Sequence, residues 1–296
     1  MRLKVVLNPR AGGGRAASEE EVARRALTEA GIQFDIELTQ GPGDGVRIAR
    51  VAAERGYDVV AAMGGDGTTN EVVNGIADSG ATLAVIPAGS GNDFANALGI
   101  PRNDVAAACR AIVHGDRRRI DLCRVNEHYF ISSFGIGFDA QVTRAANEKF
   151  KFLKGVWVYV FAVLNTIWTY RPALMRILAD DCEIRLSPLL VAATNWKSYG
   201  GGMMICPEAS IDDGLFEMCV VDNMPVLRFL YCFPRVMKGT HVHTMPEVRA
   251  FRASSLRIEC SRPEAFHIDG EVFEAKEMVF TITHDGLEVV FGEVAR

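Results

Sequence analysis

The chain has 296 residues and a net charge of −5, with 49% hydrophobic and 23% charged residues. This length allows about two domains, and the composition is that of a globular protein with a sizeable core. The negative charge argues against broad binding to nucleic acid. The seven cysteines are scattered without Cys-x-x-Cys spacing, which disfavours a zinc site and indicates a reducing compartment.

The first third of the chain alternates strand-like and helical segments. The runs "RLKVVLN", "IQFDIEL", "DVVAAM" and "TLAVIP" predict strands. Apolar residues at helical spacing predict helices at residues 18–30, 45–55, 68–76, 92–98 and 105–113. This alternation predicts an α/β domain, with a parallel sheet and helices on its faces.

From about residue 121 strand-like segments dominate. They are "HYFISSFGIGF", "ALMRILAD", "LLVAATN", "LFEMCVV", "SLRIEC", "MVFTITH" and "GLEVVF". Many of them alternate apolar and polar residues, as antiparallel strands with one solvated face do. Helical stretches interrupt them around residues 150–170 and 226–238. We therefore expect a second, β-rich and sandwich-like domain, whose exposed strand edges would allow a homodimer.

Three glycine-rich segments each follow a predicted strand and precede a helix. They are "NPRAGGGR" (8–15), "MGGDGTTNE" (63–71) and "PAGSGND" (87–93). In a parallel sheet all three lie at the carboxyl edge, where open α/β sheets bind ligands. Glycine lets the backbone approach a phosphate, and the following helix offers N–H groups. The segments therefore predict a phosphate site, although each could also be only a tight turn.

Two carboxylates, Asp66 and Asp93, lie within these glycine segments. A carboxylate ~4 Å from a phosphate charge costs roughly 4 kcal/mol at an effective dielectric constant of 20, so bare phosphate disfavours both. A divalent cation between them reverses the sign, which favours a magnesium–nucleotide complex and phosphoryl transfer. The alternative is that both acids cap helices. Further along, "FHIDGEVFE" contains Asp269 and Glu271, but Asp-Gly between strands is also a hairpin signal.

Five segments, in order and spanning nearly the whole chain, are similar to one family. They are "NPRAGGG", "GGDGTTNEVVNG", "PAGSGNDFANALG", "DDGLFE" and "HIDGEVFE". The sequence resembles the bacterial lipid kinases of the diacylglycerol kinase catalytic-domain family, which include soluble diacylglycerol kinase and YegS-like proteins. It departs from the family's P-x-G-T-x-N-D pattern at Ser90 and Gly91, and Ser90 keeps the hydroxyl group.

This resemblance implies two domains. A Rossmann-like ATP domain, similar to those of NAD kinase and phosphofructokinase, would comprise residues 1–122 and 287–296. A β-rich lipid-substrate domain would comprise residues 123–286. It also implies that the ATP phosphates contact Asn8, Gly12, Gly64, Gly65, Gly67, Thr68, Gly89, Ser90 and Asn92.

The resemblance further implies the catalytic and metal-binding roles. Asp66 and Asp93 would organise the catalytic Mg²⁺, partly through water. Asp269 would be the general base, with Glu271 assisting on the Mg–ATP side. A structural Mg²⁺ would bind the Asp213 side chain and the carbonyl groups of Ser210 and Leu215, unless this segment is only an Asp-Gly turn.

The most lipophilic run, "VWVYVFAVLNTIW" (156–168), has 13 residues and is too short to span a bilayer. Lys149, Lys151 and Lys154 precede it, and basic residues beside aromatic ones suit an interfacial helix on an anionic membrane. The alternative, which we favour for most of the run, is burial in the domain. We expect a cytoplasmic protein that attaches peripherally to the inner face of the membrane.

Taken together, the sequence predicts an ATP-dependent kinase that phosphorylates the hydroxyl of a membrane lipid, with diacylglycerol as the expected acceptor. Sphingoid bases, monoacylglycerols, prenols and NAD remain alternative acceptors, and a nucleotide-sensing module is an alternative from another class.

Several remaining polar residues receive no catalytic role. "GIGFDA" (135–140) matches a dinucleotide pattern but lies outside any βαβ unit, so we expect a structural turn. His241 and His243 alternate as on a strand and are expected at the surface. Nothing in the sequence assigns a role to His267.

Overall fold

The structure is a computed structural model that describes residues 1–102, 104–149 and 156–292. The chain divides into two compact units, Met1–Leu122 with Asp285–Arg296 (unit 1) and Cys123–His284 (unit 2). It passes between them within strands β5 (Arg117–Val125) and β14 (Glu271–Val290). Lys151, Lys154 and the start of the predicted helix at 150–170 lie outside the described residues.

Unit 1 is built on a parallel sheet with the strand order β2-β1-β3-β4. These strands are β1 (Arg2–Leu7), β2 (Gln33–Leu38), β3 (Val59–Gly64) and β4 (Thr82–Pro87). The end of β14 adds a parallel neighbour, with Val289 beside Leu83 of β4. Every residue of β3 and β4 is buried, as expected of central strands covered on both faces.

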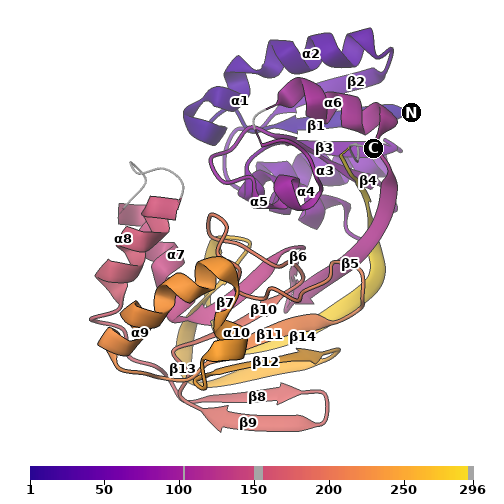
Figure 1. The fold of residues 1–296 in the computed structure, drawn as a ribbon. Helices are drawn as coiled ribbons and strands as arrows, with labels where there is room; N and C mark the ends of the chain where they lie inside the picture. Colours follow the sequence, from indigo (N-terminus) through magenta and orange to yellow (C-terminus); the bar gives the residue numbers. More distant parts are fainter. Residues whose placement is uncertain (103, 150–155, 293–296) are drawn as a thin grey trace. The chain divides into compact units, whose positions relative to one another are not determined.

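Helices cover both faces of this sheet, so the predicted parallel α/β domain is confirmed. They are η1 (Ala11–Gly13), α1 (Arg15–Ser18), α2 (Glu20–Glu29), α3 (Asp44–Glu54), α4 (Asp66–Ile76), α5 (Asp93–Ala97) and α6 (Val105–His114). Figure 1 shows α1, α2 and α6 on one side of the sheet and α3, α4 and α5 on the other. Helix α4 begins at Asp66, two residues before the predicted start, which brings this carboxylate into the first helical turn.

Unit 2 is β-rich and its strands pair antiparallel, as predicted. The order β12-β11-β10-β7-β13-β14 is extended by β8, which pairs with β13 and β9, and by β6, which pairs with β5. The bounds are β6 (His128–Phe130), β7 (Ser133–Gly137), β8 (Met175–Ala179), β9 (Cys182–Leu186), β10 (Leu190–Thr194), β11 (Phe216–Val221), β12 (Val248–Ala253) and β13 (Leu256–Ile268).

Two strand predictions differ from the structure. The run "HYFISSFGIGF" forms two strands, β6 and β7. They are separate because the backbone N–H groups of residues 131–133, where β6 ends and β7 begins, donate hydrogen bonds to the Asp269 carboxylate. Conversely, "MVFTITH" and "GLEVVF" are one continuous strand, β14. The Asp-Gly pair at 285–286, a turn signal in the sequence, lies inside this strand.

Helical segments of unit 2 pack on one face of its sheet. They are α7 (Phe138–Lys149), α8 (Val156–Thr166), α9 (Val226–Cys232), η2 (Phe233–Lys238) and α10 (His241–Thr244). The expectation that His241 lies on a strand at the surface is wrong, because it begins α10 and is 2% exposed. Among the helices of the described ranges, none is both long and apolar enough to cross a membrane.

Two apolar clusters stabilise unit 2, one on each face of the sheet. Strand β10 shows the division, since Val191 and Ala193 join the first cluster while Ala192 joins the second. Successive side chains of a strand point to opposite faces, so a strand buried on both sides contributes to two cores. The second cluster lies between the sheet and the helices, and it surrounds the cavity described below.

Candidate active site

The three glycine segments lie at the carboxyl edge of the unit 1 sheet, as predicted, and they contact one another. A Cβ atom on Gly89 would lie 2.3 Å from the Gly65 Cα atom. Similarly, a Cβ atom on Gly12, whose φ is +61°, would lie 2.4 Å from the Ala88 carbonyl oxygen. Contacts this close exclude any larger residue, so these glycines are required for loop packing whether or not a phosphate binds.

Side chains tie the three segments together. The Asn8 Nδ2 group donates to Thr68 Oγ1 at 3.1 Å, which links the first loop to the first turn of α4. Asn92, with a φ of +56°, bonds twice to the backbone of Gly89, at 2.9 Å and 3.0 Å. The Arg15 guanidinium donates to the Gly89 carbonyl at 2.7 Å. The loops therefore form one preorganised group, in which Ser90 is exposed.

Asp66 and Asp93 are adjacent in space, because the Phe94 N–H group donates to Asp66 Oδ1 at 3.1 Å. The N-caps of α4 and α5 are Gly65 and Asn92, so neither acid is the capping residue that the alternative required. The Asp93 carboxylate also pairs with Arg102 at 3.0 Å. Carboxylate oxygens are the ligands that Mg²⁺ prefers, so these two partly buried acids fit a water-bridged Mg²⁺, with Arg102 as a competing positive charge at Asp93.

Asp269 lies in the two-residue turn between β13 and β14. Its φ is +47° and that of Gly270 is +93°, the left-handed pair that a tight hairpin turn requires. Its carboxylate accepts the N–H groups of Ile131, Ser132 and Ser133, at 3.2, 3.1 and 2.8 Å. The orientation of the carboxylate is therefore fixed by backbone groups. Glu271 is exposed at the start of β14.

The segment predicted to hold a structural Mg²⁺ is a turn closed by its own side chains. Asp213 Oδ1 accepts the Leu215 N–H group at 3.1 Å, and the Ser210 hydroxyl donates to Asp212 at 2.7 Å. The Arg252 guanidinium lies 3.9 Å from Asp213 Oδ2 and already supplies a positive charge there. Across the described ranges, no three His, Cys, Asp or Glu side chains form a metal-binding group.

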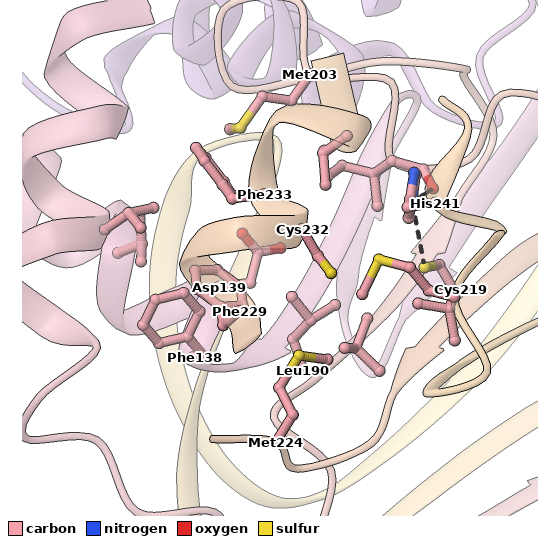
Figure 2. A pocket seen from close by; sticks show the side chains of 17 residues that line it. Phe138, Asp139, Leu190, Met203, Cys219, Met224, Phe229, Cys232, Phe233 and His241 are labelled. Carbon is pink, nitrogen blue, oxygen red and sulfur yellow. Dashed lines mark hydrogen bonds between the residues drawn. The ribbon is translucent and has the colours of Figure 1, made fainter. Parts of the chain in front are cut away.

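Unit 2 contains an apolar cavity of about 60 Å³ between the sheet and the helices. Figure 2 shows its lining, which includes Phe138, Leu190, Met203, Met224, Phe229 and Phe233. Among the described residues of this lining the carboxylic acid is Asp139, at the start of α7, and its carboxylate lies among these apolar side chains. Asp139 belongs to the segment "GIGFDA", in which we expected only a structural turn.

The Asp139 carboxylate has two side-chain partners. Tyr199 donates its hydroxyl to Oδ2 at 2.5 Å, and His267 Nε2 lies 3.0 Å from the same oxygen. Burial, followed by the negative charge of Asp139, raises the pKa of Tyr199 well above its usual value, so the phenol stays protonated. Sequence reasoning missed this group because its members lie 60 and 128 residues apart.

Helix α8 has one buried and one exposed face. Ala162, Val163 and Ile167 are buried, each 5% exposed or less. The opposite face, continued just beyond the end of the helix, carries an exposed apolar stripe, which we call the α8 stripe: Trp157, Phe161, Leu164 and Trp168, with exposed fractions of 61%, 46%, 42% and 58%. These four exposed large apolar side chains follow one another at helical spacing along a single face.

Comparison with known proteins assigns a family to each unit. Residues 2–125 match the diacylglycerol kinase catalytic domain, and residues 132–291 match the YegS C-terminal NAD kinase beta sandwich-like domain.

Individual relatives agree with this assignment. The chain is 31% identical to the diacylglycerol kinase of Bacillus subtilis, over 91% of this chain and 89% of the relative. It is 32% identical to that of Mycobacterium tuberculosis strain H37Rv, over 88% and 85%. A crystal structure of a candidate diacylglycerol kinase from Bacillus anthracis superposes with a TM-score of 0.82 at 26% identity, covering 98% of this chain and 97% of that one. The protein therefore belongs to the diacylglycerol kinase and YegS-like family of lipid kinases.

Proposed function

We propose that this lipid kinase transfers the γ-phosphoryl group of ATP to the hydroxyl of diacylglycerol and forms phosphatidic acid. The observation that carries the proposal is the set of three interlocked glycine loops with Asp66 and Asp93. The named relatives, diacylglycerol kinases at about 31–32% identity, support the choice of acceptor. The apolar cavity of unit 2 supports an acceptor with acyl chains, which would open it further.

On the nucleotide side, the loops offer backbone N–H groups and the N-termini of α4 and α5 to the phosphates. Asp66 and Asp93 would hold Mg²⁺, which when bound neutralises phosphate charge during transfer. The Asn8–Thr68 and Asn92–Gly89 bonds hold the loops in place before ATP arrives. This preorganisation matters because phosphoryl transfer depends mainly on positioning and electrostatic stabilisation.

On the acceptor side, Asp269 would accept the proton of the lipid hydroxyl as that oxygen attacks the γ-phosphorus. A bond forms between the lipid oxygen and phosphorus, the bond from phosphorus to the β,γ-bridging oxygen breaks, and ADP leaves with the electron pair. The three backbone N–H groups that bind Asp269 support this role, since they fix the direction of the carboxylate.

We also propose that the α8 stripe contacts an anionic bilayer. Aromatic side chains at positions 157, 161 and 168 suit the membrane interface, where one side of a helix is buried in lipid. The Lys149 ammonium lies beside this helix, 3.2 Å from Asn165 Oδ1, and provides charge complementary to anionic lipid. The enzyme would thus reach its acceptor by peripheral attachment.

An acceptor panel tests the function. Purified protein is incubated with Mg²⁺, labelled ATP and one acceptor at a time: dioctanoylglycerol, monoacylglycerol, sphingosine, a prenol or NAD. We expect dioctanoylglycerol to have the highest kcat/KM, with labelled phosphatidic acid as product. A higher value for any other acceptor would contradict the diacylglycerol assignment, and labelling of NAD alone would contradict lipid phosphorylation by this chain.

A further inference from the structure

The Tyr199–Asp139–His267 network is a buried polar group to which the proposed reaction assigns no role. The His267 side chain is 2% exposed and that of Asp139 is 12% exposed. The ring of His267 has no partner at Nδ1 within the described residues, so its contact with Asp139 is what fixes its orientation. The network is therefore not fully satisfied within the described residues, and its two contacts to Asp139 oppose displacement of the elements that carry Tyr199 and His267.

Strand β7 leaves space for this network. Gly135 of β7 pairs with His267 of β13 in the sheet register. A Cβ atom on Gly135 would lie 2.1 Å from Asp139 Oδ2 and 2.4 Å from His267 Nε2. No side chain can therefore occupy position 135 while His267 and Asp139 are in contact.

The same two strands hold the Asp269 turn. Asp269 lies two residues beyond His267, and its own N–H group donates to the Ser133 carbonyl at 2.9 Å. The N–H groups that orient its carboxylate belong to residues 131–133, which lead into β7. The position of β13 against β7 therefore determines the direction of the Asp269 carboxylate. The Tyr199–Asp139–His267 network acts on that position through His267, two residues before Asp269.

The network also meets the cavity. Asp139 is part of the cavity lining, so a lipid chain that enters would contact the carboxylate to which Tyr199 and His267 bind. Asp139, at one end of the network, would thus contact the acceptor, while His267, at the other end, lies on β13, the strand that leads into the Asp269 turn.

We propose that Tyr199, Asp139 and His267 are positioning residues that hold the Asp269 turn in place. Through them, the binding of a lipid chain in the cavity affects the conformation of that turn. The proposal rests on the function proposed above, in which Asp269 accepts the proton.

Four single substitutions test the positioning role. Tyr199→Phe removes only the donor hydroxyl. Tyr170→Phe is the matched control, because the Tyr170 hydroxyl is also buried in unit 2 but has no hydrogen-bond partner in the described ranges. His267→Leu removes the second donor, and His267→Gln restores an N–H group at a similar reach. For each variant we would measure kcat, the KM for ATP, and amide hydrogen exchange in peptides that cover residues 131–137 and 266–271.

We expect Tyr199→Phe and His267→Leu to lower kcat about tenfold, the effect of losing one hydrogen bond to a charged group, with the KM for ATP unchanged within twofold. Exchange in both peptides should be several-fold faster, and dioctanoylglycerol should slow it in the wild type but not in His267→Leu. Tyr170→Phe should match the wild type, and His267→Gln should recover most of kcat.

Two results would overturn the proposal: unchanged exchange in Tyr199→Phe and His267→Leu, or faster exchange with an unchanged kcat. If the wild type phosphorylated another lipid instead, the acceptor assignment would fail, but the exchange results would still decide the positioning role.

Discussion

Replacing Asp66 with Asn removes one negative charge and keeps the shape of the side chain. The Asn amide oxygen can still accept the Phe94 N–H group that Asp66 Oδ1 accepts at 3.1 Å, so the α4–α5 contact survives. A unit charge interacts with a second at ~4 Å by roughly 4 kcal/mol at an effective dielectric constant of 20. If Asp66 acts on a magnesium–phosphate complex, kcat should therefore fall by about three orders of magnitude.

Asp66→Ala should add a structural effect to the catalytic one. Without an acceptor, the partly buried Phe94 N–H group is left unsatisfied, which costs about 1–3 kcal/mol of unfolding free energy. Asp66→Asn should instead unfold at the wild-type denaturant midpoint. Comparison of the two variants thus separates the charge of Asp66 from its role in joining the loops.

The assay combines steady-state kinetics, ATP binding by calorimetry and urea unfolding. Asp104→Asn is the matched control, because Asp104 caps α6 through the Ala107 N–H group at 2.7 Å and Asn is an equally good cap. That variant should keep the wild-type kcat within twofold. A kcat for Asp66→Asn within tenfold of the wild type, or a loss of ATP affinity as large as the loss of kcat, would refute the proposed metal role.

Four other outcomes follow from the structure. Asp269→Asn should lower kcat by at least a hundredfold with ATP affinity intact, since the amide cannot accept the proton; labelled-ATP kinetics with dioctanoylglycerol would check this. Trp157→Ser with Phe161→Ser should weaken binding to anionic vesicles, measured by sedimentation, by about a thousandfold, from about 2 kcal/mol for each of the two exposed aromatic residues, without lowering the melting temperature. Asp213→Ala should reduce the rise in melting temperature that Mg²⁺ produces in the wild type, if the metal binds that turn. Burial lowers the pKa of His241 below the ordinary histidine value of about 6.5, so the folded state resists its protonation. The unfolding free energy should therefore fall as pH drops below about 6.5 towards the folded pKa, and urea melts at pH 7.5 and 5.5 should show a smaller difference in His241→Asn.

The nucleotide loops could be predicted from the sequence because their signals are local. Gly64, Gly65 and Asp66 follow an apolar strand and precede a helix, and chain order alone places such a turn at the carboxyl edge of a parallel sheet. What the sequence could not predict is that Gly65 and Gly89 touch, because that contact depends on how two separate turns pack.

The errors in unit 2 have a common physical cause. His241 follows a strand-like alternation, but its environment is set by the Ile205 carbonyl, 3.1 Å away and 36 residues earlier. Likewise, β6 and β7 separate because of a carboxylate 136 to 138 residues later in the chain. In both cases the deciding hydrogen bond comes from a residue between 36 and 138 positions away, so the local periodicity carries little information about these segments.

Asp66, proposed to act on the nucleotide side, and Asp269, proposed to act on the lipid side, share one structural feature. Each carboxylate accepts backbone N–H groups, that of Phe94 at Asp66 and those of residues 131–133 at Asp269, so peptide groups help to set the direction of both. Carboxylates held in this way move little when a substrate binds, which lowers the reorganisation needed during the reaction. Because phosphoryl transfer demands positioning more than covalent assistance, this rigidity is itself a catalytic contribution. It follows that Asp66→Asn should leave the backbone arrangement intact and report on charge, because one amide oxygen suffices for the Phe94 N–H group. In Asp269→Asn the single amide oxygen cannot replace both carboxylate oxygens, so at least one of the N–H groups of residues 131–133 loses its acceptor as well.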